Sequence, residues 1–117
     1  MNVRHGNVVI VDFIPTQPSA GTRPALVVQN DRDNARMQNT IVAQITSNIS
    51  RAREVTQLLV DPGHPSWAST GLRYPSVVNC SSLAAIRQQH VVRVIGSLSA
   101  DLMKEIDECL KAALELP

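Results

Sequence analysis

The sequence has few aromatic residues, few cysteines and no long apolar run, and each shortage excludes something. Its only aromatic side chains are Phe13, Trp67 and Tyr74, so the core must be built from Val, Ile, Leu and Ala. Cys80 and Cys109 match no zinc or redox spacing, which favours two reduced and buried thiols over a disulfide. No apolar segment approaches the roughly 20 residues of a membrane span, so no membrane contact is expected.

Motifs that mark several enzyme classes are also missing. The histidines, cysteines and acids are scattered, without the spacing of HExxH, CxxC or paired carboxylates. There is no glycine-rich phosphate loop after a strand and no GxSxG turn. Residues 1–6 show no signal-peptide pattern, which predicts a cytoplasmic protein. If the chain is an enzyme, we expect it to need no metal or cofactor and to use Arg, His and hydroxyl groups.

What is present fits one domain over residues 1–117, since 44% hydrophobic and 18% charged residues are typical of a globular chain. The net charge of +1 hides an asymmetry. Residues 1–100 carry nine arginines, no lysine and five acids, whereas residues 101–117 carry two lysines and five acids. Because the planar guanidinium fork matches phosphate, the arginine-rich body is either ordinary solubilising charge or a surface for a polyanion.

Hydrophobic patterning predicts about six short strands, mostly antiparallel. The β-branched, apolar segments are residues 6–14, 24–30, 40–46, 55–60, 76–79 and 90–98. Pro24 can open its strand but cannot lie centrally in it. Composition predicts loops at 15–22 and 61–75, and Asx residues predict a turn at 30–34.

The C-terminal helix is the clearest element. Ser99 is a typical N-cap, and Asp101 in the first turn suits the helix dipole. Apolar residues then recur on one helical face, at Leu102, Ile106, Cys109, Leu110, Ala113 and Leu114. The sum predicts an α+β, mainly β fold in which this helix covers an open face of the sheet.

Three stretches resemble the MazF/PemK family of toxin endoribonucleases. They are residues 6–13 (GNVVIVDF), residues 21–31 (GTRPALVVQND), which hold a G-x-R-P signature, and residues 42–47 (VAQITS), which hold I-T-S. Residues 95–99 (IGSLS) followed by an amphipathic helix also close the chain as family members do. The resemblance implies a small SH3-like, partly open antiparallel barrel of the CcdB/Kid/MazF type, assembled as a homodimer.

The same resemblance implies a function. The chain would be the toxin of a type II toxin-antitoxin system, an mRNA interferase that cleaves single-stranded RNA, mainly mRNA, at selected sequences. The reaction would need no metal and leave 2′,3′-cyclic phosphate and 5′-hydroxyl ends. The implied partner is a MazE-like antitoxin whose acidic tail blocks the RNA channel.

Arg23 and Thr46 are the candidate catalytic residues. Pro24 biases the backbone of Arg23 towards extended conformations, and a guanidinium there can hold phosphate oxygens and stabilise charge in the transition state. By resemblance, Arg23 is also a candidate proton donor to the leaving oxygen. Thr46 ends a predicted strand, where its hydroxyl can donate to the same phosphate. The alternatives are a solvated loop arginine and an ordinary strand-forming threonine.

Candidate RNA-binding residues surround this pair. Gln17 and Ser19 lie in the loop that, by resemblance, covers the active site and reads the substrate. Trp67, with Tyr74, either stacks on bases or packs beneath the long loop, and Arg73 lies between them. The remaining candidates for contacts to bases or phosphates are Asn30, Ser47, Asn48 and Arg51.

The resemblance leaves the general base unassigned. Family members carry an Arg and an Asp after the strand that matches 76–79, or a Q-x-R-T run just beyond it. Here these positions hold Asn79 and Ser81, and the residues SLAA at 82–85. His64 is either the replacement, because histidine titrates near neutral pH, or a solvated loop residue.

Two other functions remain open. A module of the same fold that poisons gyrase, of the CcdB kind, needs no Arg23 and Thr46 pair. A catalytically decayed relative would keep only dimerisation and antitoxin binding. Fold alone does not choose among these functions.

Overall fold

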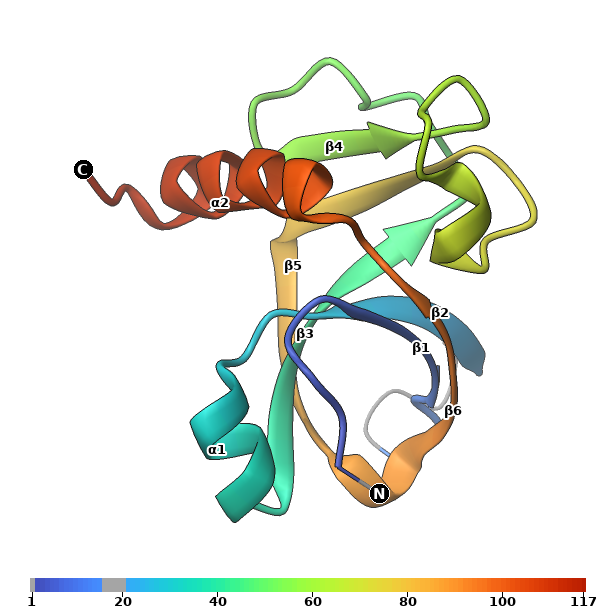
Figure 1. Cartoon of the computed structure of the whole chain (residues 1–117). Coiled ribbons are helices and arrows are strands. Elements are labelled where there is room, and N and C mark those ends of the chain that lie inside the picture. The colour runs from blue at the N-terminus through green and yellow to red at the C-terminus, as the bar shows by residue number, and fades with distance from the viewer. Residues whose placement is uncertain (1, 16–20) are drawn as a thin grey trace.

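A six-stranded antiparallel sheet organises the computed structural model, which describes residues 2–15 and 21–117 (Figure 1). The strand order is β4-β5-β3-β2-β1-β6, with β4 and β6 at the two edges. Because this order is linear while the sheet coils on itself, the barrel is only partly closed, and the predicted α+β, mainly β fold is confirmed. The strands are β1 (Asn7–Asp12), β2 (Thr22–Val27), β3 (Asn39–Thr46), β4 (Gln57–Val60), β5 (Ser76–Arg87) and β6 (Val91–Ser97).

The predicted C-terminal helix is confirmed as α2 (Ala100–Leu114). It begins where the Ser99 hydroxyl accepts a hydrogen bond from the Leu102 N–H. Leu102, Ile106 and Cys109 are buried, and the helix lies across β4 and β5 in Figure 1. One residue of the predicted apolar face departs from it, because Leu114 is 53% exposed near the helix end.

Two apolar clusters form the core, and alternation along the strands assigns residues to them. Val8 and Leu26 face one cluster, together with Ile45 and the buried side of α2. Their neighbours Val9 and Ala25 face the second cluster, which also contains Phe13, the only fully buried aromatic side chain of the described residues. This period-two pattern fixes which side chains of β1, β2 and β3 can line a surface on each side of the sheet.

Two predicted elements need correction. Residues 30–34, predicted as a turn, begin the helix α1 (Asp31–Arg36), because Asn30 caps it by accepting from the Asp33 N–H at 2.9 Å. Acids in its first turn and Arg36 in its last favour the helix dipole. The strand predicted at 76–79 continues as β5 to Arg87, past a register shift opposite Ala43 and Gln44.

The long loop predicted at 61–75 is folded onto β6. It contains a short 3₁₀ helix, η1 (Trp67–Thr70). This helix is followed by Gly71, whose φ is +73°. A side chain at Gly71 would collide with the backbone of Ile95, so glycine permits this close approach. The approach places residues 71–74 beside β6. A second 3₁₀ helix, η2 (Gln88–His90), links β5 to β6.

No helix in residues 2–15 and 21–117 combines the length and apolar character that a membrane crossing requires.

Candidate active site

A cavity of about 370 Å³ opens where β2 and β3 meet the end of the long loop and β6. Apolar side chains, among them Ile45 and Ile95, form part of its wall. Polar and cationic side chains form the remainder. The described lining is Ile10, Arg23, Pro24, Ile45, Thr46, Ser47, Gly71, Leu72, Arg73, Tyr74, Ser76, Arg93 and Ile95.

Strand register brings Arg23 and Thr46 to this cavity together. The β2–β3 ladder pairs Ala25 with Gln44, Leu26 with Ala43 and Val27 with Val42. Continuing the same count past the last pair sets Arg23 opposite Thr46. Both residues also belong to the described lining, so the two predicted catalytic side chains share this cavity.

Pro24 accounts for the end of that ladder. It lies within β2 and pairs with Ile10 of β1, but pairing with β3 stops one residue later along the chain, at Ala25. Proline has no N–H to donate and is tolerated where a strand is paired on one side only. The end of the ladder leaves room for the side chains of Arg23 and Thr46 to line the cavity.

The Thr46 hydroxyl is oriented by the backbone that follows it. Its oxygen accepts a hydrogen bond from the Asn48 N–H at 3.1 Å. A hydroxyl that accepts one bond retains its own proton for donation. Because Thr46 is only half-buried and lines the cavity, that proton is available to a group bound there.

The electrostatics of the cavity are one-sided. Arg23, Arg73 and Arg93 all contribute to its lining, and all three are exposed. The described lining contains no aspartate, glutamate or histidine. Such a site favours an anion with oxygens in several directions, as a phosphodiester has, because guanidinium groups bind such oxygens with paired hydrogen bonds.

Arg93 lines the cavity but is absent from the site prediction. Tyr74, which the sequence offers with Trp67 as a stacking platform, is 67% exposed beside the cavity. Arg93 pairs with Ile10 across β1, in a part of β6 with two register shifts. The sequence shows an arginine in a strand. The register shifts decide which face of the sheet its side chain lies on, and the sequence does not reveal such shifts.

Two of the predicted RNA-binding residues line the cavity, namely Ser47 and Arg73. Asn48 lies two residues beyond Thr46, and its side-chain oxygen accepts from the Ser50 N–H at 3.1 Å. Gln17 and Ser19 lie outside the described residues.

Three predicted RNA-binding residues have other partners and do not line the cavity. Arg51 binds both carboxylate oxygens of Glu54, at 2.6 and 2.8 Å, which raises the pKa of Arg51 and lowers that of Glu54. Asn30 caps α1 at the opposite end of β2. Trp67 packs, partly buried, against the core cluster beneath α2.

His64 also lies outside the cavity lining. Its Nδ1 accepts from the Ser66 N–H at 3.1 Å and lies 2.8 Å from the Ser66 hydroxyl, which in turn donates to Ser99. These bonds tie the long loop to the N-terminus of α2. His64 therefore stabilises the long loop, and it does not place a proton acceptor at the cavity.

The two cysteines are free and buried, in agreement with the reduced thiols expected from the sequence. They neighbour each other where β5 meets α2. Burial, with a smaller contribution from Cys109, raises the pKa of Cys80 to about 12. Within the described residues, no three or more His, Cys, Asp or Glu side chains form a group that could hold a metal ion.

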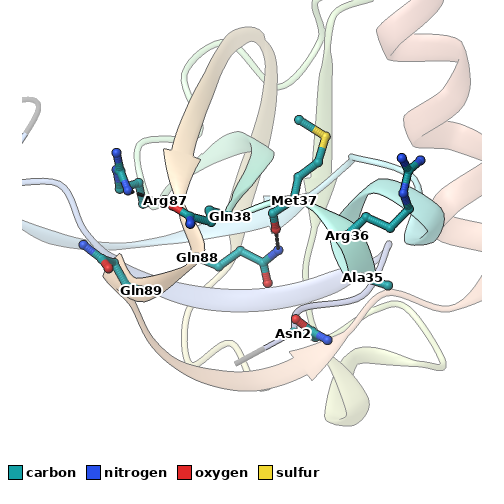
Figure 2. Close-up of a pocket in the computed structure, with 8 residues that line it drawn as sticks. All are labelled: Asn2, Ala35, Arg36, Met37, Gln38, Arg87, Gln88 and Gln89. Atoms are coloured by element: carbon teal, nitrogen blue, oxygen red, sulfur yellow. Dashed lines mark hydrogen bonds between the residues drawn. The ribbon is translucent and has the colours of Figure 1, made fainter.

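A second cavity, of about 420 Å³, lies at the other end of β3 and β5 (Figure 2). Its central polar group, Gln88, is used by the fold: Nε2 donates to the Asn34 and Met37 carbonyls, and Oε1 accepts from the Val3 N–H. In Figure 2 the side chains of Arg36 and Arg87 stand well apart, on either side of Met37. The described lining of this cavity holds no hydroxyl side chain, whereas Arg23 and Thr46 both line the first cavity.

Comparisons with known proteins agree with this architecture. A family model described as PemK-like, MazF-like toxin of type II toxin-antitoxin system matches residues 4–114. Endoribonuclease EndoA of Bacillus subtilis (strain 168) is 32% identical over 118 residues, covering 99% of this chain and 97% of the relative.

Two solved structures carry the same fold. The Mycobacterium tuberculosis toxin MazF-mt6 has a TM-score of 0.78 at 26% identity, covering 95% of this chain and 98% of that one. An endoribonuclease in complex with its cognate antitoxin, from Mycobacterial species, has a TM-score of 0.78 at 21% identity, covering 98% and 97%. The match to the family model spans nearly the whole chain. The chain therefore belongs to the family of PemK-like, MazF-like toxins of type II toxin-antitoxin systems.

Proposed function

We propose that this protein is the toxin of a type II toxin-antitoxin pair and an endoribonuclease that cleaves single-stranded RNA, mainly mRNA, at selected sequences. The observation that carries the proposal is that Arg23 and Thr46 line one cavity together with two further arginines. Membership of the toxin family supports it, as does the Bacillus relative, which is named an endoribonuclease.

The chemistry follows from what the two side chains can do. The guanidinium of Arg23 binds the non-bridging oxygens of one phosphodiester, and the Thr46 hydroxyl donates its free proton to the same group. Both interactions strengthen as negative charge accumulates on the phosphoryl oxygens in the transition state. The cavity thus stabilises attack at phosphorus.

In the proposed reaction the ribose 2′-hydroxyl attacks the adjacent phosphorus. A bond forms from the 2′ oxygen to phosphorus, the bond from phosphorus to the 5′ oxygen breaks, and a 2′,3′-cyclic phosphate results. The 2′-hydroxyl loses its proton to water or a phosphoryl oxygen, since the described lining holds no carboxylate or imidazole. The leaving 5′ oxygen gains a proton and becomes a hydroxyl, with Arg23 as the candidate donor.

The proposal extends to partners and location. The antitoxin would be MazE-like, with an acidic segment that competes with RNA for the same arginines. The active form would be a homodimer acting in the cytoplasm. An antitoxin complex is known for the mycobacterial neighbour of the same fold.

The test is cleavage of mixed-sequence RNA by the purified protein in EDTA, compared with Arg23→Ala. We expect cleavage by the wild type, a loss of at least about a hundredfold in the variant, and 2′,3′-cyclic phosphate ends on the products. Arg36→Ala, an exposed arginine far from the cavity, is the matched control and should cleave normally.

Each rival function predicts a different result from the same preparation. A gyrase poison would trap cleaved DNA on the topoisomerase and leave RNA intact. A decayed toxin would bind antitoxin and cleave neither nucleic acid. Either outcome would contradict the proposal.

A further inference from the structure

Arg93 of β6 is a cavity-lining arginine to which the proposed reaction gives no role. Within the described residues its guanidinium makes no ion pair or hydrogen bond, whereas Arg51 is held by Glu54 and Arg87 donates to Gln38. Its side chain nevertheless has a defined place, because it lines the cavity that Arg23 and Thr46 share. An unpartnered cation in a built cavity without carboxylates is available to an anionic ligand.

The backbone of β6 explains how Arg93 reaches the cavity. Ile10 of β1 pairs with Arg93, and the next residue, Val11, pairs with Val91, so Val92 is an extra residue on β6. A second register shift leaves Ile95 as another extra residue. Bulges of this kind turn neighbouring side chains and occur often beside active sites. Ile95 and Arg93 are both directed to the cavity lining.

The sheet also separates Arg93 from the catalytic pair. Pro24, Ile10 and Arg93 form one row across β2, β1 and β6. Neighbouring strands lie about 4.8 Å apart, so along the sheet Arg93 is about 10 Å from β2, and further from Thr46 on β3. The guanidinium of Arg93 therefore faces a different part of a bound strand from the phosphate between Arg23 and Thr46.

We propose that Arg93 is a positioning residue that binds the backbone phosphate next to the scissile one. RNA then crosses the cavity from β3 towards β6, held at two phosphates by arginines of the separate strands β2 and β6. This inference rests on the proposed ribonuclease function and adds to it the second anchoring point of the substrate. Arg93 contributes binding to ground and transition states alike, and so sets KM rather than kcat.

The first experiment measures binding without cleavage. A single-stranded RNA with every 2′-hydroxyl methylated lacks the nucleophile, so binding to all variants can be compared over a range of salt concentrations. Each phosphate contact contributes about 0.7 to the slope of log affinity against log salt for single strands. We expect Arg93→Gln to lower that slope by about 0.7 and the affinity about tenfold.

Two matched variants separate charge from structure. Arg93→Lys keeps the charge and should retain the wild-type salt slope while recovering only part of the affinity, since lysine lacks the planar fork. Arg36→Gln removes the same charge on α1, outside the active cavity, and should leave the slope unchanged. Circular dichroism should show all three variants folded, because both arginines are exposed.

Cleavage kinetics give an independent readout. With unmodified RNA, Arg93→Gln should raise KM about tenfold and leave kcat within about twofold, in contrast to the loss of kcat expected for Arg23→Ala. The inference is overturned if Arg93→Gln matches Arg36→Gln in slope and KM, or if it lowers kcat alone, while the wild type still binds and cleaves RNA. A wild type that neither binds nor cleaves RNA overturns the proposed function, and the role of Arg93 with it.

Discussion

At the scale of single residues, Thr46 shows how a backbone hydrogen bond prepares a side chain for chemistry. Its oxygen accepts from the Asn48 N–H, which leaves the hydroxyl proton to be donated into the cavity. Ser47, Tyr74 and Ser76 also bring hydroxyls to the described lining, but the continued β2–β3 count sets Thr46 opposite Arg23. In the proposed mechanism this bond holds the threonine in position before substrate arrives, as preorganised catalysis requires.

Removing that hydroxyl should cost activity without loss of fold. Thr46→Val keeps the shape of the side chain but removes the donor, and we expect the cleavage rate to fall about 10²–10³-fold. Stability should change by less than about 1 kcal/mol, because the residue is only half-buried. Initial cleavage rates and urea unfolding measure both quantities. The same change at the exposed Thr22, outside the lining, is the control, and an equal loss there would contradict the role of Thr46.

Asn30 is a predicted RNA-binding residue to which the structure gives a role in the fold. The sequence makes it a candidate for RNA contacts, but its side-chain Oδ1 caps α1 by accepting from the Asp33 N–H. Asn30→Ala should therefore lower the free energy of unfolding by about 1 kcal/mol and leave RNA affinity and cleavage positions unchanged. A variant of normal stability with altered cleavage positions would restore the RNA-binding interpretation.

At the scale of elements, local chemistry predicted α2 well and α1 poorly. The N-cap Ser99 and the apolar period from Leu102 to Ala113 lie within one segment, so the sequence alone identifies the helix. In α1 the same capping chemistry is present, but six residues with one buried side chain, Asn34, carry no hydrophobic period. The segment is stabilised by its contacts with distant parts of the chain, which a local pattern does not contain.

The second half of β5 was missed for a related reason. Its pairing with β3 shifts register between Ala43 and Gln44, which pair with Leu83 and Asn79. The intervening residues interrupt the alternation that identifies a strand, and the Cys80 N–H donates to the Thr56 carbonyl instead. A bulge of this kind is stabilised by neighbouring strands, so only the assembled sheet reveals where the strand ends.

Gln88 joins three such elements through one side chain. It bonds the Val3 N–H and the carbonyls of Asn34 and Met37, and it is only 5% exposed. Gln88→Leu leaves all three backbone groups without a partner, so we expect the free energy of unfolding to fall by about 2–4 kcal/mol. Chemical denaturation measures this loss, with the exposed neighbour Gln89 changed to Leu as control. Equal stability of the two variants would show that water replaces the Gln88 bonds without cost.

At the scale of the whole molecule, the family resemblance singled out Arg23 and Thr46, and the alternation of apolar residues predicted the sheet. It did not predict which other residues reach the cavity. Arg73 approaches because Gly71 lets the long loop pack on β6, and Arg93 approaches because β6 is bulged. Both events depend on contacts between distant segments. The residues that the strands bring to the candidate site can therefore be predicted from the sequence, whereas those that loops and register shifts bring there cannot.

The contact between α2 and the sheet should make stability depend on alkaline pH. The buried Cys80 thiol, beside Cys109, has a pKa of about 12, against 9.0 for an ordinary thiol. Above pH 9 the unfolded chain releases this proton while the folded chain retains it, so folding is favoured fully below pH 9 and less as pH rises towards 12. The free energy of unfolding should fall by up to about 1.4 kcal/mol per pH unit across this range.

Urea unfolding between pH 8 and pH 10.5, under a thiol reductant, measures this dependence. Burial also raises the pKa of the neighbouring Cys109 thiol, so the decisive quantity is the difference between the wild type and Cys80→Ala. The variant is expected to start less stable, because it leaves a small void beneath α2, and to lose stability more slowly above pH 9. Parallel curves for the two proteins would mean that the helix already separates from the sheet at alkaline pH, exposing the thiol before the rest of the molecule unfolds.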